Sequence, residues 1–143
     1  MNKNKMLKFL IDSDFQLISA RFNRQTFATG ATVLTEGTVS PALYLLVSGS
    51  VKVVRDVLDE EVVVAQLGPG EMLGITSLLD GSAISATVVT NEPSAFDWIT
   101  MTDLHALLES VPGLATRFYR SLGSVLADRL DAVLSQVTPP SDE

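Results

Sequence analysis

The sequence predicts a single domain that is mainly β, with helices near both ends of the chain. Between residues 23 and 99, short runs rich in Val, Thr and Leu alternate with turn residues, at the spacing of about 8–12 residues typical of a sandwich or barrel. Helix capping signals and apolar periodicity occur mainly before and after this region. A chain of 143 residues is long enough for one hydrophobic core, and no repeat or linker divides it.

The N-terminal region, residues 1–22, predicts two helices. The first is short and covers residues 5–11. In the second, Ser13 is the expected N-cap and Gln16 its capping-box partner, and the helix continues to Arg21. Its expected buried side consists of Phe15, Leu17, Ile18 and Phe22.

Residues 23–99 predict the β part of the domain. Its turns are marked by Pro41, Gly49 and the Gly-Pro-Gly cluster at 68–70. The acidic run at 56–61 indicates a solvated hairpin tip, and residues 75–79 indicate one short helix between two strands. The last strand is expected at 95–99.

The C-terminal region, residues 100–137, predicts two helices followed by a tail at 138–143. Thr100 and Asp103 form a capping signal for a helix at 101–109. Pro112 suits the first turn of a long helix, because the N–H that proline lacks would have no intrahelical partner there. This helix is expected to run from about residue 113 to residue 137.

The composition excludes several classes of function. The net charge of −7 and the scattered basic residues argue against nucleic-acid binding, which requires a basic face. The absence of cysteine excludes disulfides and thiolate sites, and a metal site or catalytic triad built on the lone histidine, His105, would lack its usual partners. No segment has the length of a signal peptide's apolar core or a membrane span. We therefore expect a cytoplasmic protein that is neither an enzyme nor a metalloprotein.

Three motifs indicate a family. ALYLLVSGSVKVV, residues 42–54, contains a strand, a glycine turn and a second strand. LGPGEMLGITSLLDGSAISATVV, residues 67–89, contains a glycine-flanked turn, a short helix and a strand, and ADRL lies at 127–130. Together they resemble the cyclic-nucleotide-binding domain of the catabolite-activator and protein-kinase-regulatory type. The resemblance covers nearly all of residues 1–143 and implies a β-roll, a jelly-roll-like double-stranded β-helix, with its phosphate-binding cassette at residues 70–89.

The resemblance also assigns positions within the cassette. The two cassette glycines correspond to Gly70 and Gly74. The family's glutamate, which accepts a hydrogen bond from the ribose hydroxyl, corresponds to Ile75. The family's arginine, which pairs with the cyclic phosphate, corresponds to Ile84 and is followed in order by Ser85 and Ala86. The candidate ligand-binding positions are Gly74, Ile75, Thr76, Ser77, Ile84, Ser85 and Ala86.

Ile75 and Ile84 are aliphatic where the resemblance implies a glutamate and an arginine, and this changes the expected function. Three interpretations of the cassette stay open: a loop kept only for the fold, a pocket for an apolar or neutral ligand, and retained cyclic-nucleotide binding. Neutral donors remain for a phosphate, namely backbone N–H groups at 75–77 and the hydroxyls of Ser77, Ser82 and Ser85. We expect a non-enzymatic regulatory module without a cofactor that has lost cyclic AMP and cyclic GMP binding. The alternative is a small-ligand sensor that signals through its C-terminal helix.

The long C-terminal helix carries an apolar stripe at intervals of three to four residues, made by Leu122, Leu126, Leu130 and Val133. One β-roll covers only part of so long a helix. The stripe therefore predicts a homodimer through this helix, while simple packing on the roll and binding of another protein stay as alternatives. No DNA-binding helix-turn-helix follows the long helix in this sequence, so no nucleic-acid partner is expected, and no membrane either.

Overall fold

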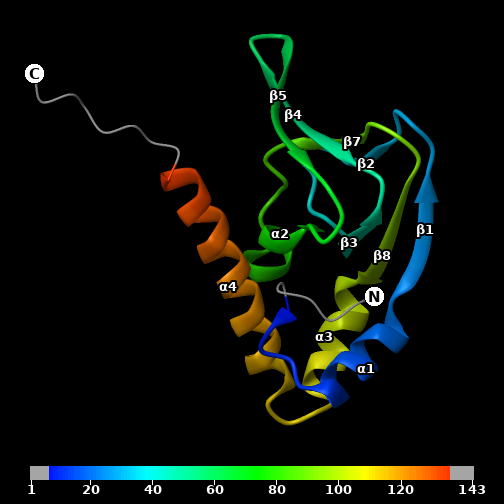
Figure 1. Ribbon diagram of the computed structural model, residues 1–143, viewed down its shortest axis with the longest axis vertical. Coiled ribbons are helices and arrows are strands. Elements are labelled where there is room, and N and C mark those ends of the chain that lie inside the picture. The colour runs from blue at the N-terminus through cyan, green and yellow to red at the C-terminus, as the bar shows by residue number, and fades with distance from the viewer. Residues whose placement is uncertain (1–6, 136–143) are drawn as a thin grey trace, which may run out of the picture.

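The computed structural model describes residues 7–135, in which two four-stranded antiparallel sheets form a roll and four helices lie outside it (Figure 1). The helices are α1 (Asp12–Arg21), α2 (Ile75–Asp80), α3 (Met101–Glu109) and α4 (Leu114–Leu134). The strands are β1 (Asn23–Phe27), β2 (Thr32–Leu34), β3 (Ala42–Ser48), β4 (Val51–Val57), β5 (Glu60–Leu67), β6 (Met72–Leu73), β7 (Thr87–Thr90) and β8 (Ser94–Thr100). The sheet orders are β1-β8-β3-β6 and β2-β7-β4-β5. The predicted class, mainly β with flanking helices, is confirmed, and so is the β-roll.

The two central strands of the first sheet are buried on both faces. Leu43 of β3 pairs with Ile99 of β8, and both side chains belong to the core beneath the helices. Leu46 pairs with Phe96 in the same ladder, and both side chains belong to the core inside the roll. Successive side chains of a strand point to opposite faces of the sheet. Because these strands carry apolar residues on both faces, one sheet contributes to two cores.

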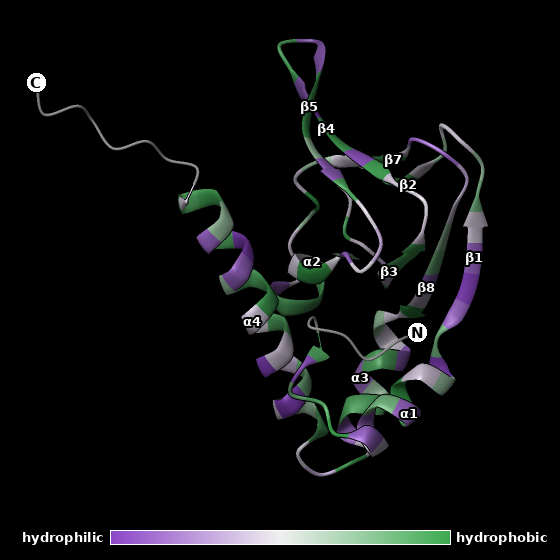
Figure 2. Ribbon diagram, in the orientation of Figure 1, coloured by the Kyte–Doolittle hydropathy of each residue, from purple (hydrophilic) through white to green (hydrophobic). Residues whose placement is uncertain are grey.

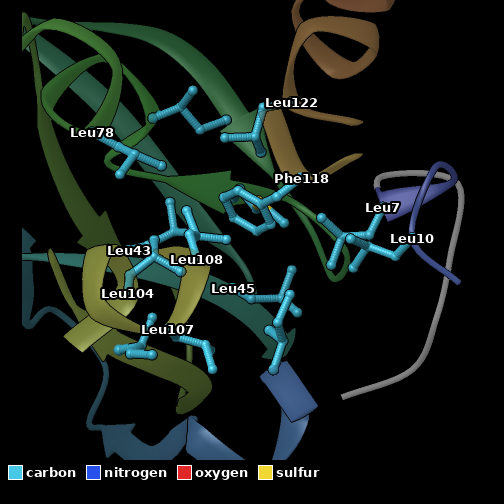
Figure 3. Packing of buried hydrophobic residues seen from close by; sticks show 14 of the residues in the cluster. Leu7, Leu10, Leu43, Leu45, Leu78, Leu104, Leu107, Leu108, Phe118 and Leu122 are labelled. Carbon is cyan, nitrogen blue, oxygen red and sulfur yellow. The ribbon is translucent and has the colours of Figure 1, made fainter. Parts of the chain in front are cut away.

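The larger core lies between this sheet and the helices. Leu104 and Leu108 of α3 and Phe118 and Leu122 of α4 are all at most 3% exposed (Figure 3). Leu78 of α2 belongs to the same cluster, so the cassette helix is packed against the helical layer. The N-terminal half of α4 is therefore fixed to the roll by apolar packing.

The β4–β5 hairpin extends away from the rest of the roll (Figure 1). Its two-residue turn places Leu58 and Asp59 at positive φ, the conformation of the type I′ turn that suits twisted hairpin strands. Leu58 is 94% exposed, and residues 56–61 are all exposed. The acidic run therefore forms the solvated tip that the sequence predicts.

The N-terminal predictions need two corrections. Leu7 has 3₁₀ geometry, residues 8–9 form a turn, and Ile11 is the extended N-cap of α1, so no α-helix covers the described part of the predicted helix at 5–11. Ser13 lies inside α1 and is not its N-cap. The Asp14 carboxylate accepts a hydrogen bond from the Ile11 N–H at 3.2 Å. Ile11 is therefore the N-cap, and the helix begins earlier in the sequence than predicted, at Asp12.

The two C-terminal helices follow the predicted order. Thr100 caps α3, because its side chain accepts a hydrogen bond from the Asp103 N–H at 3.1 Å. Helix α4 begins at Leu114 after Gly113 at a φ of +80°, so Pro112 precedes the helix instead of opening its first turn. Helix α4 ends at Leu134, and residues 136–143, with the predicted last turn and tail, lie outside the described part.

The apolar stripe of α4 divides into two parts. Leu122 is 0% exposed within the domain's own core, so the prediction that it lies between two copies is wrong. Leu126 is half-buried, whereas Leu130 and Val133 are 58% and 61% exposed. Figure 2 shows hydrophobic residues continuing to the C-terminal end of α4, beyond the roll. Within residues 7–135, no helix has the length and hydropathy needed to cross a membrane.

A buried ion pair joins α1 to α4. Asp14 is 2% exposed and accepts hydrogen bonds from Nε and Nη2 of Arg117, the latter at 2.8 Å. This bidentate contact raises the pKa of the Arg117 guanidinium. The contact spans 103 positions of sequence, so it forms only when the two helices dock.

We predict that Asp14→Ala lowers the free energy of unfolding by about 3 kcal/mol, at the low end for a broken buried pair. The reason for the low end is that the Arg117 side chain, 28% exposed, can still reach water. Urea denaturation measures the change. Glu61→Ala is the control, because the exposed Lys52–Glu61 pair should contribute less than about 1 kcal/mol. Equal effects of the two substitutions would contradict the prediction.

Candidate functional site

The cassette helix α2 begins at a turn that requires glycine. Gly74 joins β6 to α2 with a φ of +91°, in the left-handed region that side chains rarely adopt. A Cβ at this position would lie 2.7 Å from the Ala42 carbonyl oxygen. The glycine therefore lets the cassette pass directly against strand β3.

Backbone hydrogen bonds hold the far side of the cassette. The Ile84 N–H donates to the Thr38 carbonyl at 2.7 Å, and the Gly37 N–H donates to the Ile84 carbonyl at 2.8 Å. These bonds fix the loop between α2 and β7 against the loop between β2 and β3. Because they use only main-chain groups, they place residue 84 whatever its side chain is.

A pocket of about 250 Å³ lies between the cassette, the roll interior and α4. Six of the seven predicted ligand-binding positions line it, namely Gly74, Ile75, Thr76, Ile84, Ser85 and Ala86. Leu126 and Arg129 of α4 also line it. The cassette positions therefore come together in space as the resemblance implies, and the last helix contributes to the same pocket.

Ser77, the seventh predicted position, does not line the pocket. It is 7% exposed, its hydroxyl donates to the Ser82 carbonyl at 2.8 Å, and it accepts from the Ser40 N–H at 3.0 Å. Ser82 is also engaged, because its hydroxyl and N–H donate to Asp80 and lower the pKa of that carboxyl. Both serines shape the cassette, and their hydroxyls are already used.

Ile75 and Ile84 belong to different hydrophobic cores. Ile75 is 4% exposed and belongs to the core under the helices. Ile84 is half-buried and packs against the core inside the roll. Each side chain therefore extends an apolar cluster at a position where the resemblance implies a charged residue.

The charge at the pocket comes from α4. Arg129 Nη2 donates to Glu71 Oε2 at 2.7 Å and to the Met72 carbonyl at 3.2 Å. The arginine and glutamate side chains are 39% and 36% exposed. In the sequence, ADRL at 127–130 shows only a similarity to the final helix of a known family. The pair joins positions 58 apart, so no local pattern could have shown that Arg129 reaches the cassette.

His105 and Trp98 lie outside the pocket lining. His105 lies exposed on α3, as expected for a helix surface. Trp98 is half-buried in β8, and its indole N–H has no hydrogen-bond partner among the described residues. Within residues 7–135, no three acidic, histidine or cysteine side chains are grouped so as to hold a metal ion.

Comparison with known proteins places this geometry in a family. Residues 24–110 match the family model described as "Cyclic nucleotide-binding domain". The chain is also 32% identical over 131 residues to the "Cyclic AMP receptor protein" of Thermus thermophilus. That match covers 91% of the chain but only 59% of the relative, so the chain spans less than two thirds of that protein.

Solved structures agree with the sequence comparison. The catabolite activator protein of Thermus thermophilus matches with a TM-score of 0.76 at 32% identity, over 92% of this chain and 61% of that one. The N-terminal domain of a transcriptional regulator from Streptomyces coelicolor matches with a TM-score of 0.77 at 27% identity, over 99% and 97% of the two chains. The roll, the cassette and the matched sequence lead to one conclusion: the chain belongs to the cyclic nucleotide-binding domain family.

Proposed function

We propose that this domain is a non-enzymatic regulatory module that has lost the binding of cyclic AMP and cyclic GMP. One observation carries the proposal: Ile84, which the resemblance aligns with the family's phosphate-pairing arginine, packs into the roll interior. Ile75, at the glutamate position, is likewise buried among apolar side chains. A cyclic nucleotide in this pocket would meet apolar side chains at both positions where the family has a charged one.

The energetic cost of these two changes is large compared with ordinary ligand affinities. A hydrogen bond to a charged group contributes about 1.5–3 kcal/mol. Loss of both contacts should therefore weaken binding by about 3–5 kcal/mol, or some hundreds to thousands of times. Arg129 does not restore the missing contact at position 84, because it reaches the pocket from α4 and not from the loop between α2 and β7.

The module is proposed to act as a homodimer through the distal half of α4. Leu130, Val133 and Leu134 are each more than half exposed, and Leu126 adjoins them on the roll side. Burying such side chains contributes about 1.5–3 kcal/mol each. A second copy, related by a two-fold axis, covers both strips at once. A different protein partner on this strip is the alternative outcome.

A small-ligand sensor is the second candidate function. One observation favours it: the pocket is lined both by the cassette and by Leu126 and Arg129 of α4. A ligand there would contact the helix whose distal half carries the exposed apolar strip. Ligand binding in the pocket would therefore affect the position of the α4 surface proposed for dimerisation.

The composition also bears on where the protein is located and which partners it has. The absence of cysteine and the net charge of −7 favour a reducing, cytoplasmic location and disfavour nucleic acid as a partner. A catalytic role has no support in the pocket, because its lining contains neither the lone histidine nor a carboxylate.

The first prediction concerns cyclic nucleotides. Calorimetric titration of the wild type with cyclic AMP and with cyclic GMP should show no binding with a Kd below about 10 μM, or roughly −7 kcal/mol. Ile84→Arg is the informative variant, because Ile84 is half-buried at the pocket and a cation there should strengthen phosphate binding measurably. Ile75→Glu is less suitable, since it would bury a carboxylate in the core. Tight binding by the wild type would refute the proposed loss.

The second prediction concerns the dimer. Wild-type protein should sediment as a dimer at about 100 μM, a concentration at which even a modest interface is populated. Leu130→Asp with Val133→Asp should give a folded monomer, because unpaired carboxylates are costly in an apolar contact. Val39→Asp is the matched control, since Val39 is 56% exposed and lies outside α4. A monomeric wild type, or a dimer that survives the double substitution, would exclude this contact.

A further inference from the structure

The cassette pocket combines apolar walls with a single cation, and we propose that its ligand is a small amphipathic acid. In this arrangement an aliphatic chain occupies the pocket and a carboxylate pairs with Arg129. The inference rests on the sensor function proposed above and specifies the chemical class that such a sensor detects. It differs from cyclic-nucleotide recognition because the cation comes from α4 and the walls offer no charged group for a ribose or a base.

The walls suit an aliphatic body. Apart from α4 and the predicted ligand-binding positions, the residues that line the pocket are all apolar, among them Leu34, Val53, Leu67 and Val88. Its volume of about 250 Å³ lies below the roughly 300 Å³ at which typical ligand sites begin. A short, narrow molecule with few polar atoms fits this space better than a large polar one.

Arg129 is placed to receive an acidic group without losing its present partner. Both of its hydrogen bonds to described residues use Nη2, so the N–H groups of Nε and Nη1 remain for a ligand. The side chain is 39% exposed and can adjust its direction. Thr76 and Ser85 also line the pocket, and their hydroxyls make no hydrogen bond within residues 7–135, so they are free to donate to a bound carboxylate.

The same contacts would couple the ligand to the helix. Arg129 immediately precedes Leu130 in α4, and Leu126 lies one turn earlier in the pocket lining. A carboxylate shared by Arg129 and the cassette, with its chain against Leu126, would hold the distal half of α4 at the roll. Ligand binding would therefore favour one orientation of the exposed strip.

A three-ligand calorimetric series tests the proposal on the whole chain. Octanoate, 1-octanol and octylamine share one aliphatic body and differ in charge. Octanoate should bind about tenfold to a hundredfold more tightly than octanol, as one charged hydrogen-bonded contact implies, and octylamine should bind most weakly.

Two variants and a control assign the effect to the pocket. Arg129→Gln should bind octanoate and octanol about equally, and it should fold, because exposed ion pairs contribute little to stability. Arg120→Gln is the control: this arginine lies on the same helix, but its guanidinium stacks 4.1 Å from the Phe9 ring centroid. Ser85→Phe should weaken all three ligands by filling the pocket from an exposed position.

The outcomes separate this inference from the function on which it rests. Binding of octanol as tight as that of octanoate, or an unchanged preference in Arg129→Gln, would overturn the role of Arg129 but leave a sensor for neutral ligands. No heat with any of the three ligands would overturn the small amphipathic ligand altogether, and the dimer prediction would still be tested independently.

Discussion

The sheet β1-β8-β3-β6 has to serve two hydrophobic cores, and the rest of the domain depends on this constraint. The paired Leu43 and Ile99 face the helices, while the paired Leu46 and Phe96 face the roll interior. An apolar outer face cannot stay in water, so α1, α3 and the first half of α4 must cover it. The position of α4, and with it the one charged side chain of the pocket, follows from this burial.

The cassette lies where the two cores meet, and contacts that do not involve the side chains at positions 75 and 84 hold its shape. Gly74 allows the close approach to β3, and main-chain hydrogen bonds at Ile84 fix the loop. Ser77 joins the cassette helix to the neighbouring loop. None of these contacts needs a charged side chain at position 75 or 84. Aliphatic residues there instead add to the packing of the two cores, so fold and ligand recognition can change separately.

Local sequence signals predicted the features that depend on neighbouring residues. The glycine turn at 49, the acidic hairpin tip and the Thr100 cap all form as expected, because their geometry is set within a few positions. The Ser13 cap does not form. Its competitor, Asp14, is held by Arg117, and that partner is 103 positions away. A capping pattern cannot anticipate a distant side chain that favours one helix start over another.

The sequence by itself determined the order and type of the elements, the positions of the cassette residues and the presence of an apolar stripe on the last helix. The elements and the apolar stripe follow from period, turn chemistry and spacing, which are local properties of the chain, whereas the cassette positions follow from the resemblance to a known family. Only the tertiary structure decided that Leu122 belongs to the domain's own core while Leu130 lies in solvent, and that Arg129 meets Glu71 beside the pocket. The physical reason is that a regular stripe looks the same along its whole length, whereas burial ends where the underlying sheet ends.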